Sequence, residues 1–121
     1  MTDPQLNQTT NVGAPHLTEA NFDEALHNAD GKPLFVDFYA DWCGPCKAAA
    51  PVVEKLATEY DGKVIIAKLD VDANREIAVK YGVMSIPTVL VFKDGEEVDR
   101  KIGYPGESGY RQMLDKVAPA A

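Results

Sequence analysis

The sequence has little cysteine and little histidine, and this limits the disulfide and metal chemistry open to it. It contains two residues of each kind among 121. Two cysteines cannot cross-link a small secreted scaffold, and a structural zinc site normally needs four side-chain ligands. The histidines, His16 and His27, lie eleven residues apart and well upstream of the cysteines. We therefore expect no metal site.

Basic residues and long apolar runs are also scarce. The net charge is −7 at pH 7, from 12 Lys and Arg against 19 Asp and Glu, and the basic residues are scattered. A surface that neutralises phosphates is therefore not expected. No run approaches the ~18 apolar residues that cross a bilayer, and the N-terminus lacks the basic and apolar regions of a leader peptide. We expect a cytoplasmic monomer that binds neither nucleic acid nor membranes.

What is present suits one folded domain. Hydrophobic residues make up 45% of the chain and charged residues 26%, which is close to the globular average. Residues 1–15 are rich in Asn, Gln, Thr and Pro, so we predict a flexible N-terminal extension there. The domain itself is expected to span residues 16–121.

Hydrophobic periodicity predicts alternating helices and strands in this domain. Pro51 should kink the long helix, and Asp94-Gly95 should close a β-hairpin. Ser108 is the expected N-cap of the last helix. The predicted order is a helix over 21–29, a strand over 33–40, a helix over 43–60, a strand over 63–72, a helix over 74–82, a hairpin over 88–102 and a helix over 108–117. This order predicts an α/β layered fold, with parallel early strands and an antiparallel last strand.

Both cysteines lie in the stretch YADWCGPCKAAAP, at the junction of a predicted strand and helix. Residues three apart on a helix have Cβ atoms ~5–6 Å apart, close to disulfide distance. Free N–H groups at the helix start favour a thiolate at Cys43, which is therefore the natural nucleophile, with Cys46 one turn further in. Pro45 suits the first helical turn, and Gly44 leaves room for another chain. Half a zinc site and two ordinary buried cysteines are the alternatives.

The chain resembles the thioredoxin family in WCGPCK at residues 42–47, SIPT about forty residues later at 85–88, and the glycine of KIG, Gly103. The resemblance covers roughly residues 16–118. It implies a thioredoxin-like three-layer sandwich, in which helices flank both faces of a mixed sheet of four to five strands. It also implies a cis Ile86–Pro87 peptide beside the cysteines, where the backbone of Ile86 would bind substrate. The expected substrate surface is an apolar ring around Cys43, formed by Trp42, Pro45, Ile86, Pro87 and Gly103, although Trp42 alone could equally be a core residue.

The family resemblance also implies catalytic roles for Asp37 and Lys68, which interrupt two apolar strands. Asp37 shares one side of its strand with Phe35 and Tyr39, so burial should raise its pKa and suit it to proton transfer. Lys68 is the expected partner of Asp37. Alternatively, Asp37 satisfies a buried donor, or Lys68 extends to the surface.

The resemblance implies a protein-disulfide reductant that cycles between a Cys43/Cys46 dithiol and a disulfide. Its partners would be disulfide-containing proteins and an NADPH-dependent flavoprotein, thioredoxin reductase. No cofactor would be bound to the chain itself. The alternative is a binding module that docks on enzymes through the ring around Trp42, with incidental cysteines.

Overall fold

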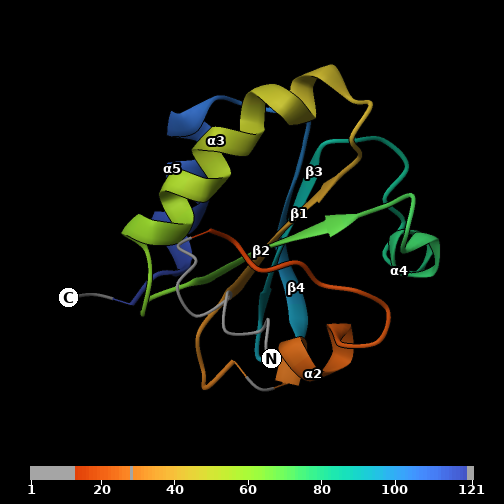
Figure 1. Cartoon of the computed structure of the whole chain (residues 1–121). Helices are drawn as coiled ribbons and strands as arrows, with labels where there is room; N and C mark the ends of the chain where they lie inside the picture. Colours follow the sequence, from red (N-terminus) through yellow and green to blue (C-terminus); the bar gives the residue numbers. More distant parts are fainter. Residues whose placement is uncertain (1–12, 28, 120–121) are drawn as a thin grey trace, which may run out of the picture.

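The computed structural model describes residues 13–27 and 29–119, and its elements follow the predicted order (Figure 1). They are α2 (Phe22–His27), β1 (Leu34–Tyr39), α3 (Gly44–Glu59), β2 (Ile65–Asp70), α4 (Arg75–Lys80), β3 (Thr88–Lys93), β4 (Glu96–Ile102) and α5 (Glu107–Val117). None of the helices in these two ranges has the length and hydrophobicity of a membrane span.

The central sheet has four strands in the order β2-β1-β3-β4. β1 and β2 are parallel, whereas β3 is antiparallel to both of its neighbours, β1 and β4. The hairpin turns at Asp94 and Gly95, whose φ angles of 55° and 83° suit the two-residue turn predicted from this pair. In the strand order of this sheet, β1 is a central strand and β2 lies at the edge.

Helices cover both faces of the sheet, which confirms the three-layer sandwich (Figure 1). Residues of α3 and α5 pack on one face, in a cluster that includes Phe35 of β1. Residues of α2 and α4 pack on the other face, with Leu34 and Val36. Because side chains alternate along a strand, Asp37 shares the face of Phe35 and points towards the α3 and α5 layer.

Two predictions about the helices have different outcomes. The predicted N-cap at Ser108 is wrong, because α5 begins at Glu107 and Gly106 occupies the N-cap position without a side-chain cap. Gly106 has a φ of 87°, a conformation open mainly to glycine, so the chain turns into the helix before it reaches Ser108. Pro51 lies inside α3, where it cannot donate a backbone hydrogen bond. The kink expected there stays a prediction.

Residues 13–15, which composition assigned to the extension, lie against the domain. Ala14 is 7% exposed, and its N–H donates to Glu54 Oε1 at 2.7 Å. The Pro15 carbonyl accepts the Lys68 N–H at 2.9 Å, and His16 forms a parallel bridge with Lys68. This segment therefore runs beside the edge strand β2. The rest of the predicted extension, residues 1–12, lies outside the described residues.

Candidate active site

Cys43 and Cys46 form a disulfide, with Cα atoms 5.2 Å apart. Cys43 is the N-cap of α3, just beyond the carboxyl end of β1, where open α/β sheets commonly hold their active sites. The Cys46 N–H donates to Cys43 Sγ at 3.1 Å, a contact that would favour a thiolate at Cys43. The two cysteines are thus a pair of the redox type, rather than separate buried thiols. Among the described residues, no group of three or more His, Cys, Asp or Glu could hold a metal ion.

Exposure does not distinguish the two cysteines. Both are 4% exposed in this disulfide form. Their surroundings differ instead. Cys43 Sγ lies 3.9 Å from the Ile86 carbonyl oxygen on the outer side, whereas Cys46 lines a cavity on the inner side.

On the outer side, the residues next to Cys43 in the chain are exposed, whereas Ile86 is half-buried and Pro87 is buried. Trp42 is 68% exposed and is therefore not a core residue. Its Nε1 donates to Asp72 Oδ2 at 2.8 Å, which fixes the orientation of the indole. Gly44 and Pro45 are exposed, and a Cβ at Gly44 would meet no atom within 4 Å. Trp42 and Pro45, two residues of the predicted ring, therefore lie at the surface.

The loop opposite Cys43 completes the outer side. The Ile86–Pro87 peptide is cis, as the resemblance implied. The Gly103 N–H donates to the Pro87 carbonyl at 2.8 Å, so the end of β4 is joined to this loop. Met84, two residues before Ile86, is 94% exposed and adds an apolar side chain beside the loop.

On the inner side, a cavity of about 170 Å³ connects Cys46 with Asp37. Ala50 also lines it, and its small side chain leaves this space open. A water molecule occupies ~30 Å³ of liquid, so the cavity has room for water between the carboxyl group and Cys46. The full lining is Asp37, Tyr39, Ala40, Asp41, Cys46, Lys47, Ala50 and Lys68.

Asp37 is buried as predicted, with only 1% exposure. Burial raises its pKa to about 6, an effect that the Lys68 ammonium opposes and the Glu54 carboxylate reinforces. Asp37 Oδ1 has no hydrogen-bond partner among the described residues. This argues against the alternative that the carboxyl serves mainly to satisfy a buried donor.

Lys68 lies beside Asp37 but does not form the expected direct pair with it. The two residues are Cα partners in the β1–β2 register. Within the described ranges, however, the ion pair of Lys68 is with Glu54, whose Oε2 lies 3.3 Å from Nζ. The ammonium also lies 5.0 Å from the centroid of the Tyr39 ring. Lys68 therefore acts on Asp37 through its charge, and its preferred contact is on α3.

Sequence reasoning missed two residues near Asp37. Glu54 follows Cys46 and Ala50 at intervals of four, which places all three on one side of α3, and this spacing could have indicated it. Tyr110 of α5 packs edge-on against Phe35, with ring centroids 5.4 Å apart. Its hydroxyl is buried without a partner among the described residues, and its pKa is raised by burial and by the nearby charge of Asp37. No local pattern marks Tyr110, because it resembles any apolar position of α5.

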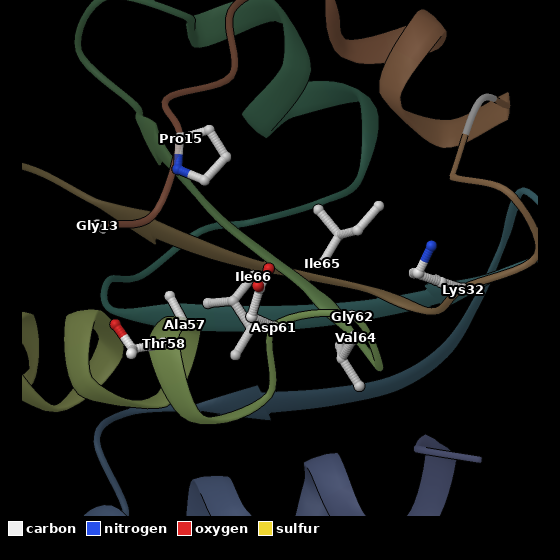
Figure 2. Close-up of a pocket in the computed structure, with 10 residues that line it drawn as sticks. All are labelled: Gly13, Pro15, Lys32, Ala57, Thr58, Asp61, Gly62, Val64, Ile65 and Ile66. Carbon is white, nitrogen blue, oxygen red and sulfur yellow. The ribbon is translucent and has the colours of Figure 1, made fainter. Parts of the chain in front are cut away.

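A larger cavity, of about 560 Å³, lies away from the disulfide. Figure 2 shows its lining, which comes from the segment at Gly13 and Pro15, Lys32, the end of α3 with the loop that follows, and the start of β2. Because β1 and β2 are parallel, the start of β2 is at the opposite end of the sheet from Cys43. Neither cysteine lines this cavity, which is therefore separate from the candidate active site.

Comparison with known proteins agrees with this geometry. A thioredoxin family model matches residues 13–116. Thioredoxin of Staphylococcus haemolyticus is 53% identical over 100 residues, which cover 83% of this chain and 93% of that protein. Thioredoxin of Staphylococcus aureus is 52% identical over the same extent. The solved structure of a mutant thioredoxin from Halobacterium salinarum NRC-1 superposes with a TM-score of 0.81, at 34% identity, covering 91% of this chain and 95% of that one. The chain therefore belongs to the thioredoxin family of thiol–disulfide oxidoreductases.

Proposed function

We propose that this protein reduces protein disulfides, with Cys43 as the attacking residue and Cys46 as the resolving residue. The observation that carries the proposal is the Cys43–Cys46 disulfide at the start of α3, which has an open apolar surface on one side and a cavity with a buried acid on the other. The direction follows from resemblance, because Gly44 and Pro45 stand where oxidising relatives tend to carry His. The binding-module alternative is not favoured, since it gives this redox pair no role.

In the first step, an extended segment of the substrate docks on the ring of Trp42, Pro45, Ile86, Pro87 and Gly103. The Cys43 thiolate attacks one sulfur of the substrate disulfide. A bond forms between Cys43 Sγ and that sulfur, and the other sulfur leaves as a thiolate and takes a proton. The Cys46 N–H and the start of α3 favour the thiolate form of Cys43.

In the second step, the Cys46 thiol loses its proton and attacks Cys43 Sγ. The intramolecular disulfide forms, and the second substrate sulfur leaves as a thiolate that is then protonated. Asp37, with its pKa raised to about 6, is suited to take the Cys46 proton through water in the inner cavity. Lys68 moderates the charge that Asp37 then carries. Two electrons pass from the dithiol to the substrate disulfide.

The oxidised protein must be reduced again before the next cycle. Membership of the family implies disulfide-containing protein substrates and a thioredoxin reductase as partners. We propose that this reductase is NADPH-dependent and that the chain acts as a cytoplasmic monomer. The chain needs no bound cofactor, because the cysteine pair itself carries the electrons.

A coupled assay tests the proposal. Insulin, NADPH and a bacterial thioredoxin reductase are mixed with the protein, and NADPH oxidation and insulin precipitation are followed. Both should depend on the protein, and a variant with Cys43 and Cys46 replaced by Ser should be inactive. Failure of the chemically reduced protein to cleave insulin disulfides would overturn the proposal, whichever reductase is used. Retained function in the double Ser variant would favour the binding module.

A further inference from the structure

Glu54 joins three parts of the molecule next to the inner cavity. Its Oε1 accepts the Ala14 N–H at 2.7 Å, and its Oε2 lies 3.3 Å from Lys68 Nζ. The main chain adds a further link between the 13–15 segment and β2, because the Lys68 N–H donates to the Pro15 carbonyl at 2.9 Å. One carboxylate of α3 therefore ties the 13–15 segment to a lysine of β2.

The Glu54 carboxylate occupies the space that a side chain at Gly13 would take. A Cβ built at Gly13 would collide with Glu54 Oε1. The backbone of Gly13 is not in the left-handed region, so a side chain there would meet only the Glu54 carboxylate and no conformational restriction. A substitution at Gly13 would therefore have to displace the Glu54 carboxylate.

The Lys68 ammonium lies near two carboxyl groups, those of Glu54 and Asp37. Lys68 is the strand neighbour of Asp37, and its flexible stem could bring the ammonium towards that carboxyl group. The ammonium lies instead against Glu54 and over the Tyr39 ring. Asp37 Oδ1 is left without a hydrogen-bond partner among the described residues.

We propose that Glu54 is a positioning residue for the buried acid: it holds the Lys68 ammonium away from Asp37, and the docked 13–15 segment holds Glu54. The inference rests on the proposed role of Asp37 as the base for Cys46. A carboxyl group with no cation in contact keeps its proton to a higher pH and is a stronger base when ionised. Glu54 thereby sets the pH at which Asp37 can accept the Cys46 proton.

The other titratable groups around Asp37 leave this control to Glu54 and Lys68. Val89, the strand neighbour on the β3 side, is apolar. Tyr39 of β1 and Tyr110 of α5 lie near the carboxyl group, and both have a pKa raised above the usual value, so they remain neutral near pH 6. Asp41 after β1 and Lys47 of α3 also line the cavity, but both are exposed and solvent screens their charges. The reduced protein adds the Cys46 thiol.

The test is the titration of the Asp37 carboxyl group in the oxidised full-length protein, followed by carbon NMR. Glu54→Gln should lower the midpoint by about one pH unit, because Lys68 is then free to turn towards Asp37 and a negative charge is removed. The matched control is Glu59→Gln, which removes a carboxylate from the same helix that pairs with Arg111 instead. An unchanged or higher midpoint in Glu54→Gln would overturn the proposal.

Two further variants separate positioning from a direct effect of the Glu54 charge. In a Lys68→Met background, Glu54→Gln should shift the midpoint much less, because there is no ammonium to release. Gly13→Ala should lower the midpoint in the wild-type background and add little to Glu54→Gln, as expected for changes that act through one contact. An equal shift by Glu54→Gln with and without Lys68 would contradict the positioning role.

The outcome is independent of the proposed function. The titration requires no substrate or reductase, so it decides whether Glu54 controls Asp37 even if insulin is not reduced. If insulin is reduced, the pH profile of the second step adds a kinetic measurement. The pH at which release of substrate from the mixed disulfide is half-maximal should fall in Glu54→Gln by the same amount as the NMR midpoint, and an unshifted profile would contradict the link to Cys46.

Discussion

The two sides of the Cys43–Cys46 disulfide differ in polarity and in exposure, although the two cysteines are equally buried. The outer side is apolar and partly exposed: Trp42 is 68% exposed, Ile86 is half-buried and Pro87 is buried. The inner side carries Lys68 and the buried Asp37 around a cavity of about 170 Å³, which opens to solvent at Asp41 and Lys47. Two equally buried sulfurs can therefore have different chemistry, because Cys43 lies at the surface proposed for docking and Cys46 lines a cavity next to a buried acid. The surroundings, and not the accessibility, support the roles proposed for the two cysteines.

Replacing each cysteine in turn by Ser tests this difference and should give the largest effect. Cys43→Ser should abolish disulfide reduction, because the sulfur at the docking surface is lost. Cys46→Ser should still attack through Cys43 and then stall, since no second sulfur can release the substrate. The mixed disulfide can be detected as a mass increase on a non-reducing gel or by mass spectrometry. A trapped complex with Cys43→Ser, and none with Cys46→Ser, would reverse the assignment.

The inner side is tested next by Asp37→Asn. Burial raises the folded-state pKa of Asp37 from 3.8 to about 6, so the folded protein binds the proton more tightly than the unfolded chain. The contribution of Asp37 to stability is therefore greatest below about pH 3.8, falls as the pH rises to about 6, and remains at its lowest above that. At ~1.4 kcal/mol per pKa unit, ionisation of Asp37 lowers the free energy of unfolding of the wild type at pH 8 by on the order of 3 kcal/mol relative to acidic pH.

Asn has no charge to bury, so the variant should be the more stable protein at pH 8, and its advantage should shrink towards pH 4. Urea titrations at the two pH values measure this. Asp41→Asn, a change at the exposed end of the same cavity, is the matched control and should show no such pH dependence. Asp37→Asn should also slow release of the mixed disulfide, because Cys46 loses its proton acceptor. A variant no more stable than wild type at pH 8 would mean that Lys68 neutralises Asp37 in the folded protein.

The sequence predicted the fold well because its signals are local. Asp94-Gly95 forms the turn that this pair favours, and the single charge in β1 marks a buried carboxyl group. The contacts of that charge could not be predicted in the same way. Lys68 pairs with Glu54 because α3 and the 13–15 segment meet over the edge strand, and this arrangement depends on how distant elements pack. The equal burial of the cysteines is likewise a tertiary property.

The outer side is tested by Trp42→Ala, with a smaller expected effect. Trp42 is exposed, so its loss should leave the melting temperature nearly unchanged while removing a docking contact. We expect kcat/KM for insulin to fall by about tenfold, which corresponds to ~1.4 kcal/mol. A small disulfide such as cystine cannot span the ring and is the control substrate, for which the loss should be slight. Equal losses with both substrates would show that Trp42 acts on the cysteines and not on docking.

The smallest effect is expected deep on the inner side, at Tyr110→Phe. The Tyr110 hydroxyl is buried with no hydrogen-bond partner among the described residues, and a buried unsatisfied polar group costs ~1–3 kcal/mol. Phe keeps the ring that packs on Phe35, so the variant should be more stable by about 1 kcal/mol in a urea titration. Tyr60→Phe is the matched control with the opposite sign, because the Tyr60 hydroxyl donates to Asp115 Oδ1 at 2.7 Å and that bond would be lost. A destabilised Tyr110→Phe variant would instead mean that the hydroxyl is hydrogen-bonded in solution. Since the charge of Asp37 acts on Tyr110, a water shared by the two groups would then extend the polar inner side as far as α5.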